Sequence, residues 1–165
     1  MGVEREHKYL VNDESYKNSA ESCVRIAQGY ISNNPDGTVR VRIADDKAWI
    51  TIKSRNHGDT RNEWEYPIPV TEARQMLTLL CRKTIIEKNR YIVWYAGHRW
   101  EVDEFIGDLS GLTVAEIELP YRCNTEDTTT LNNDVTYELP SWVGRNVTGD
   151  PRYYNSNLSN KVPKE

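Results

Sequence analysis

The sequence contains little of what marks several common protein classes. Its three cysteines, Cys23, Cys81 and Cys123, are widely spaced and form no CxxC pair, which argues against both a disulfide framework and a zinc site. No apolar run approaches the roughly 18 residues that a membrane span requires. We therefore expect neither a disulfide-stabilised secreted protein nor a membrane protein.

Positive charge is also in short supply. The 165 residues include 21 lysines and arginines against 25 aspartates and glutamates, a net charge of −4, so nucleic-acid binding through a basic surface is not expected. The first residues, Met1 to Glu4, lack the basic and apolar regions of a signal peptide. Because the length leaves room for one domain, we predict a single cytoplasmic domain that acts as a monomer or homodimer.

Most of the chain alternates between apolar and polar residues, as strands with one buried face do. Turn residues such as Asn33-Asn34-Pro35-Asp36-Gly37 separate these stretches. Strands are expected at residues 3–10, 23–32, 38–44, 47–54, 61–68, 84–95, 99–106 and 113–119. Eight strands can close a small barrel, so the predicted fold is mostly β (α+β), an eight-stranded antiparallel closed barrel over about residues 3–119.

Some stretches depart from this alternation. The polar residues 13–21 predict a short helix. Residues 71–82 carry apolar side chains at helical spacing, with Thr71 as the expected N-cap. Gly149-Asp150-Pro151 predicts the start of another short helix, whereas the polar residues 121–140 give no clear prediction.

Charged residues in the expected strands fall two positions apart. Side chains at this spacing lie on the same face of a strand, so Glu4, Glu6 and Lys8 share one face. The same arrangement recurs in Arg40 and Arg42, Glu63 and Glu65, Lys88 and Arg90, Glu101 and Asp103, and Glu116 and Glu118, with Lys53 on the strand between. On one strand alone, this pattern is typical of a face turned toward water.

Taken together, the separate acidic and basic strands indicate a ligand of mixed charge. Carboxylates on facing strands repel one another unless a cation is present, and a bank of lysines and arginines needs an anion. A polyanion held with a divalent metal meets both needs, because guanidinium and ammonium groups bind phosphate and carboxylates bind Mg²⁺ or Mn²⁺. The sequence has no glycine-rich loop that would hold phosphate through backbone amides instead.

Glu4-Arg5-Glu6-His7-Lys8 forms an ExExK motif, and several charged segments follow it in order. These segments are Gln28-Gly29-Tyr30, Val39-Arg40-Val41-Arg42, Ile52-Lys53-Ser54, Glu87-Lys88-Asn89-Arg90-Tyr91, Glu101-Val102-Asp103 and Glu116-Ile117-Glu118. The ordered set resembles the CYTH superfamily of triphosphate tunnel metalloenzymes, in particular its short bacterial inorganic triphosphatases. The resemblance implies a single CYTH domain over residues 1–165.

This resemblance implies a barrel whose lumen is the site, closed at one end by a C-terminal plug helix within about residues 141–160. Ligands of Mg²⁺ or Mn²⁺ are implied at Glu4, Glu6, Glu116, Glu118 and Asp103. Phosphate contacts are implied at Lys8, Arg40, Arg42, Lys53, Lys88 and Arg90, and catalytic roles at Lys8, Tyr30 and Lys88. A nearby Lys8 ammonium would lower the pKa of Tyr30 and help it to orient or deprotonate a water.

The leading hypothesis is therefore metal-dependent hydrolysis of a triphosphate, above all of inorganic triphosphate to diphosphate and phosphate. The expected plug favours a compact substrate without a base. An adenylate cyclase that converts ATP to cyclic AMP and a thiamine triphosphatase are alternatives within the same superfamily, although no adenine-reading motif is visible. The non-enzymatic alternative is a polyphosphate or nucleotide sensor, and the number of carboxylates argues against it.

Overall fold

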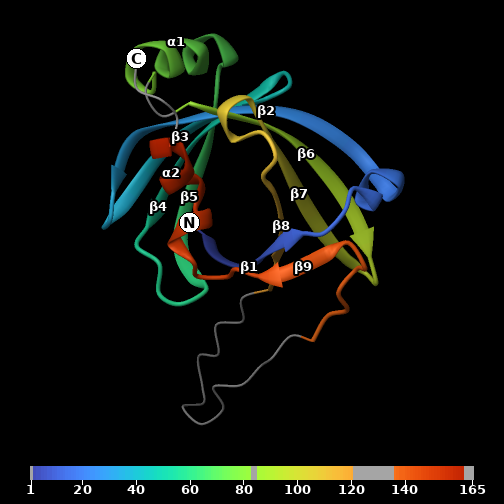
Figure 1. Ribbon diagram of the computed structural model, residues 1–165. Coiled ribbons are helices and arrows are strands. Elements are labelled where there is room, and N and C mark those ends of the chain that lie inside the picture. Colours follow the sequence, from blue (N-terminus) through green and yellow to red (C-terminus); the bar gives the residue numbers. More distant parts are fainter. Residues whose placement is uncertain (1, 83–84, 121–135, 162–165) are drawn as a thin grey trace.

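The computed structural model describes residues 2–82, 85–120 and 136–161, which form a barrel of antiparallel strands with few helices (Figure 1). The strands are β1 (Gly2–Val11), β2 (Ala20–Asn34), β3 (Gly37–Ala44), β4 (Lys47–Ser54), β5 (Thr60–Ile68), β6 (Ile86–Tyr95), β7 (His98–Ile106), β8 (Thr113–Glu118) and β9 (Val143–Asn146). Neighbouring strands pair in the order β5-β4-β3-β2-β6-β7-β8-β1, and β1 pairs with β5 to close the ring. The predicted eight-stranded antiparallel barrel is confirmed.

One edge of β1 is shared between two partners. Residues 2–5 pair with β5, whereas Tyr9 and Val11 pair with β9, which has no counterpart among the predicted strands. Beyond β9, Thr148 Oγ1 accepts a hydrogen bond from Lys8 N at 2.9 Å. The C-terminal segment is therefore part of the barrel wall, at the place where β5 leaves β1 unpaired.

The largest apolar cluster lies on the outside of this wall. Trp100 and Val102 of β7 and Ile117 of β8 are fully buried there, packed in one cluster with Tyr16 and Trp142. Successive strand side chains point to opposite faces. The charged residues between these apolar ones therefore turn into the lumen, as the alternation predicts.

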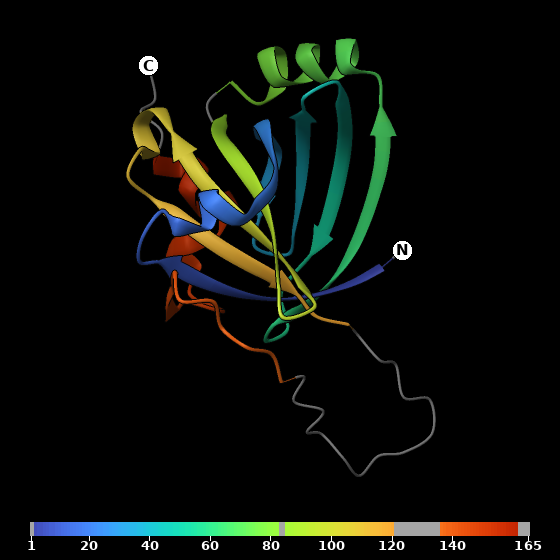
Figure 2. The ribbon, with the colours of Figure 1, turned by 90° about the vertical axis from the view of Figure 1, so that its right-hand side faces the viewer.

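Helix α1 (Val70–Leu80) packs on the outer face of β2, β3 and β4 (Figure 2). Its buried residues Ala73 and Leu77 belong to an apolar cluster with residues of β3 and β4, as their helical spacing predicts. The expected N-cap at Thr71 is wrong. The Pro69 carbonyl oxygen already accepts from Ala73 N at 3.0 Å, so the N-cap is Pro69, two residues earlier.

The C-terminal segment ends in helical turns that close one end of the barrel. A 3-10 turn at Pro151–Tyr153 leads into α2 (Asn155–Leu158), and Asp150 caps the turn by accepting from Arg152 N at 3.0 Å. Leu158 is buried in a cluster with apolar side chains of β6, β7 and β8. The predicted helix start and the plug helix are thereby confirmed.

The remaining helical segments are short. They are the 3-10 turns at Ser15–Ser19, Gly107–Leu109 and Ser159–Lys161, of which the first confirms the short helix predicted within residues 13–21. No helix in the described parts of the chain has the length and apolar character needed to cross a membrane.

Gly29 of β2 lies against the end of α1. A Cβ atom at this position would lie 2.5 Å from Cys81 Cβ and 3.2 Å from Leu77 Cδ2. We expect Gly29→Ala to lower the free energy of unfolding by about 1–3 kcal/mol through overpacking, as measured by urea denaturation. Gly2→Ala is the matched control, because a Cβ atom there would meet nothing within 4 Å. Equal stability of the two variants would contradict the close approach.

Candidate active site

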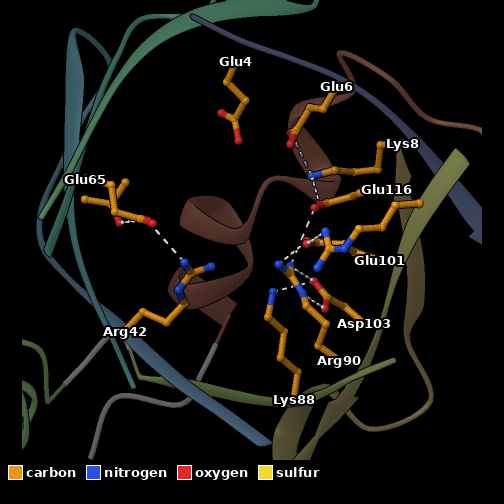
Figure 3. Close-up of polar contacts among 12 residues, drawn as sticks. Glu4, Glu6, Lys8, Arg42, Glu65, Lys88, Arg90, Glu101, Asp103 and Glu116 are labelled. Atoms are coloured by element: carbon orange, nitrogen blue, oxygen red, sulfur yellow. Dashed lines mark hydrogen bonds and ion pairs between the residues drawn. The ribbon is translucent and has the colours of Figure 1, made fainter. Parts of the chain in front are cut away.

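The lumen holds a cavity of about 470 Å³ lined mostly by charged side chains (Figure 3). Its basic lining residues are Lys8, Arg40, Arg42, Lys53, Arg61, Arg90 and Arg99, and its acidic ones are Glu4, Glu6, Glu63, Glu65, Glu101, Glu116 and Glu118. Among the described residues, seven basic side chains thus share one cavity with seven acidic ones. Of the twelve predicted site residues, all line it except Lys88 and Asp103.

Glu4 is the centre of a group of paired charges on β1, β4 and β5. Its carboxylate accepts hydrogen bonds from Lys53 Nζ at 2.8 Å and from Arg61 Nε at 2.7 Å. Lys53 Nζ also lies 2.9 Å from Glu63 Oε2. Burial opposes ionisation of Glu4, but Lys53 and Arg61 outweigh it and hold the pKa of Glu4 at about 2. Glu4 is therefore a carboxylate at neutral pH.

Lys8 forms a second paired group, between β1 and β8. It is the cross-strand partner of Glu116, and Lys8 Nζ lies 2.8 Å from Glu116 Oε1 and 3.7 Å from Glu6 Oε1. Burial alone would lower the pKa of Lys8, but Glu116 and Glu6 raise it. Burial likewise opposes ionisation of Glu116, yet Lys8 and Arg90 hold its pKa well below the usual range. Lys8 is thus a cation suited to binding phosphate oxygens.

The negative charges of Glu6 and Glu118 are less well compensated by neighbouring cations. They are cross-strand partners on β1 and β8. Burial raises the pKa of Glu6, and the carboxylates of Glu116 and Glu4 raise it further. Burial also raises the pKa of Glu118, with Glu4 as the strongest of its repelling neighbours. A cation between these side chains would relieve the repulsion.

Four of the predicted metal ligands, Glu4, Glu6, Glu116 and Glu118, line the cavity from β1 and β8. Within the described residues, no three acidic, histidine or cysteine side chains already converge as a metal site requires, because lysine and arginine partners hold Glu4 and Glu116. The donor set itself is all carboxylate oxygen, which Mg²⁺ and Mn²⁺ prefer. The residues present therefore fit such a metal in chemistry.

Asp103 and Lys88 are buried beside the cavity rather than lining it. Each side chain is 1% exposed, and Asp103 accepts from Lys88 Nζ at 2.5 Å and from Arg90 Nε and Nη2 at 2.7 Å each. Burial opposes ionisation of Asp103, but Arg90 and Lys88 lower its pKa. Two cations share this one carboxylate, and burial lowers the pKa of Lys88 to about 8 despite Asp103. The structure thus places the predicted metal ligand Asp103 between the predicted phosphate ligand Lys88 and Arg90, whose guanidinium it holds through two hydrogen bonds.

Arg40 and Arg42 of β3 both line the cavity, and Arg42 lies across the lumen from Arg90 (Figure 3). Glu65 Oε2 accepts from Thr51 Oγ1 at 2.8 Å and from Arg42 Nη2 at 3.2 Å. The Nε atoms of both arginines are buried and have no hydrogen-bond partner in the described chain. Burial and the neighbouring Arg40 lower the pKa of Arg42 to about 10. Phosphate oxygens would satisfy both arginines.

Tyr30 lines the cavity from β2, but its ionisation differs from the prediction. Burial raises the pKa of Tyr30 and outweighs the three cations that would lower it, Arg40, Arg61 and Lys8. The predicted lowering is wrong, because the sequence indicates a nearby cation but not the cost of desolvating a phenolate. Tyr30 is therefore a neutral phenol at neutral pH, which can orient a water through a hydrogen bond.

The cavity also contains five charged residues without a predicted role. Arg61, Glu63 and Glu65 alternate along β5, and Arg99 and Glu101 alternate along β7. The two-residue spacing that marked the other inward strands is present in both. That spacing was the signal available for Arg61, whose guanidinium binds the Glu4 carboxylate.

Comparison with known sequences identifies close relatives. The profile of the CYTH domain matches residues 3–154. The inorganic triphosphatase of Acetivibrio thermocellus is 46% identical over 158 residues, which cover 96% of this chain and 94% of that protein. The inorganic triphosphatase of Nitrosomonas europaea is 31% identical over 165 residues, which cover 98% of this chain and 99% of that protein.

The fold agrees with this relationship. A solved structure of an inorganic triphosphatase matches with a TM-score of 0.67 at 30% identity, over 99% of this chain and 99% of that one. The residues matched by the family profile include the N-terminal ExExK strand, the remaining seven barrel strands and the start of the plug. The chain therefore belongs to the CYTH domain family.

Proposed function

We propose that this chain is a divalent-metal-dependent triphosphatase that hydrolyses inorganic triphosphate to diphosphate and phosphate. The observation that carries this proposal is the balance of seven basic and seven acidic described side chains around one cavity. A bare triphosphate would leave several negative charges uncompensated there, and each bound Mg²⁺ or Mn²⁺ would cancel two of them. The activity named for the relatives in Acetivibrio thermocellus and Nitrosomonas europaea supports the same reaction.

The paired charges of the cavity support an exchange of partners on binding. Glu4, Glu6, Glu116 and Glu118 would hold the metal, which supplies a Lewis acid for phosphate oxygens when bound. Lys53 and Arg61 now pair with Glu4, and Lys8 pairs with Glu116. Once these carboxylates turn to a metal, the three cations are available for the triphosphate.

The remaining cations would position the phosphate chain. Phosphoryl transfer depends mainly on positioning and on neutralising charge at the transferred and leaving groups. Arg40 and Arg42 approach from one wall and Arg90 from the other. Because Asp103 holds two nitrogens of the Arg90 guanidinium, Arg90 is preorganised to stabilise the leaving diphosphate. Tyr30, as a neutral phenol, would orient the attacking water.

We expect the purified protein to hydrolyse inorganic triphosphate faster than ATP or thiamine triphosphate, with Mg²⁺ or Mn²⁺ required and EDTA abolishing turnover. The reason is that α2 closes one end of the lumen and leaves less room for a nucleoside. Chromatography of phosphate, diphosphate and cyclic AMP measures the outcome. Cyclic AMP formation would identify a cyclase, anion binding without turnover would identify a sensor, and full activity in EDTA would contradict the metal requirement.

Location and assembly stay predictions. We propose a cytoplasmic monomer or homodimer that binds neither nucleic acid nor membrane. Cys23 is an exposed free thiol, which agrees with a reducing compartment. Size-exclusion chromatography with light scattering measures the oligomeric state.

A further inference from the structure

A second hollow, of about 330 Å³, lies at the plugged end of the barrel. We call it the vestibule. It is lined by the β2–β3 turn, by residues 54–56 at the end of β4 and just beyond it, and by C-terminal residues between 154 and 160. Four residues line both the vestibule and the main cavity, namely Thr38, Arg61, Tyr154 and Ser156. The vestibule therefore adjoins the proposed triphosphate site across a neck formed by these four residues.

The vestibule differs from the main cavity in its charge. Among the described residues its lining includes two arginines, Arg55 and Arg61, five asparagines and no carboxylate. Guanidinium and amide N–H groups donate hydrogen bonds to anions. A site without carboxylates has little affinity for Mg²⁺, which proteins bind through one or two of them together with phosphate. The lining therefore suits a phosphoryl group that carries no metal.

A hydrogen bond fixes two walls of the vestibule to each other, while Arg55 in its lining is held only by an exposed ion pair. Asn33 Nδ2 donates to the Ser156 carbonyl oxygen at 2.7 Å, which ties the β2–β3 turn to α2. Arg55 Nη2 lies 2.6 Å from Asp36 Oδ1, and the two side chains are 60% and 79% exposed. Because exposed ion pairs contribute little free energy, an anion in the vestibule would compete well for Arg55.

Tyr154 is the aromatic residue of the neck. Its carbonyl oxygen accepts from Asn157 N at 2.9 Å and from Leu158 N at 2.8 Å, which fixes it at the start of α2. The centroid of its ring lies 5.9 Å from Lys8 Nζ. Tyr154 therefore lies beside a cation of the main cavity and also lines the vestibule. Loss of the ring would widen the neck without removing Leu158, which anchors α2 in the apolar cluster.

We propose that the vestibule is a metal-free phosphoryl subsite for the part of a polyphosphate that extends beyond three phosphates, and that the Tyr154 ring restricts entry to it. This inference rests on the proposed triphosphatase function, because it extends the same substrate out of the main cavity. Tyr154 is then a specificity-determining residue, which favours triphosphate over tetraphosphate by narrowing the neck.

The test compares inorganic tetraphosphate with inorganic triphosphate in Tyr154→Ala. We expect the ratio of the two kcat/KM values, tetraphosphate over triphosphate, to rise about tenfold, the scale of specificity that pocket contacts provide. Tyr154→Phe keeps the ring and should keep the wild-type ratio. Adding Arg55→Gln to Tyr154→Ala should lower the ratio again and leave triphosphate turnover unchanged. Thermal unfolding confirms that each variant is folded.

Binding measurements compare the two anions without turnover, through the ratio of their Kd values. Calorimetric Kd values for both anions, measured with Mg²⁺ in proteins that also carry Glu6→Gln, should change in the same direction. A wild type that binds but does not hydrolyse triphosphate would contradict the proposed function, and these Kd values would still test the vestibule. An unchanged ratio in folded Tyr154→Ala would overturn the inference. A larger gain for ATP than for tetraphosphate would also overturn it, because the vestibule would then accept a nucleoside.

Discussion

Glu6→Gln should lower metal-dependent turnover of inorganic triphosphate by about a thousandfold, the scale of several kcal/mol that a bound metal contributes to a transition state. The side chain keeps its length and loses only its charge. Glu6 lines the cavity beside Glu116 and Glu4, and burial together with these two carboxylates raises the pKa of Glu6. A divalent metal bound by Glu6 would relieve this repulsion between carboxylates. We therefore expect Glu6 to contribute strongly to metal affinity.

The same substitution should not destabilise the barrel. The pKa of Glu6 is raised in the folded protein, so its ionised form is less stable there than in the unfolded chain. This cost is absent in acid, where Glu6 is protonated in both states, and it grows as the pH rises above the unfolded pKa of about 4.3. At neutral pH, Glu6→Gln should therefore be at least as stable as the wild type, and the difference should vanish as the pH falls.

Three measurements decide this prediction. Turnover is assayed with Mg²⁺ and Mn²⁺, metal affinity by calorimetry, and stability by thermal unfolding across a range of pH. Glu72→Gln is the matched control, since Glu72 is an exposed residue in the first turn of α1 and should change none of them. An active Glu6→Gln protein, or one that binds metal as tightly as the wild type, would rule out the metal role of Glu6.

Alternation along single strands predicted the wall of the barrel and most of the site. Because strand side chains alternate strictly, the position of Glu4 determines that Glu6 and Lys8 turn the same way. It does not determine which side chains end at the cavity surface. Lys88 and Arg90 share one face, yet only Arg90 lines the cavity, since Asp103 binds both and Lys88 is 1% exposed.

Contacts between distant segments escaped the sequence analysis for a related reason. Strand β9 offers only Val143-Gly144-Arg145-Asn146, which is too short and too polar to alternate visibly. It becomes a strand because β5 leaves part of the β1 edge unpaired, and backbone groups there need partners. The pKa of Tyr30 likewise depends on how far burial outweighs three cations from three different strands.

Asp103→Asn should lower the free energy of unfolding by about 3–5 kcal/mol, the usual cost of removing one partner of a buried ion pair. The Asp103 carboxylate accepts hydrogen bonds from both Lys88 and Arg90, and the Asp103 and Lys88 side chains are each 1% exposed. An amide would leave both cations buried without this counter-charge. Asp108→Asn is the matched control, because Asp108 is exposed after β7 and its loss should change stability little.

The pH dependence of this stability has a definite sign. The pKa of Asp103 is lowered in the folded protein, so its ionisation stabilises the fold above the unfolded pKa of about 3.9, and this contribution is lost as the pH falls. The difference in the free energy of unfolding between the wild type and Asp103→Asn should therefore be largest at neutral pH and should shrink in acid. Urea denaturation at several pH values measures it.

A compensated variant separates support of Arg90 from metal binding. In Lys88→Met with Asp103→Leu, the buried pair becomes apolar at similar volume, a change that is often neutral or stabilising. We expect part of the stability to return, since Lys88 no longer buries an unpaired charge whereas Arg90 still lacks the Asp103 carboxylate. The affinity for Mg²⁺ should stay near that of the wild type, because neither residue lines the cavity. The KM for triphosphate should rise, since Arg90 loses the carboxylate that orients it. If this folded variant instead loses its affinity for Mg²⁺, Asp103 is a metal ligand after all, and its hydrogen bonds to Arg90 must open when metal binds.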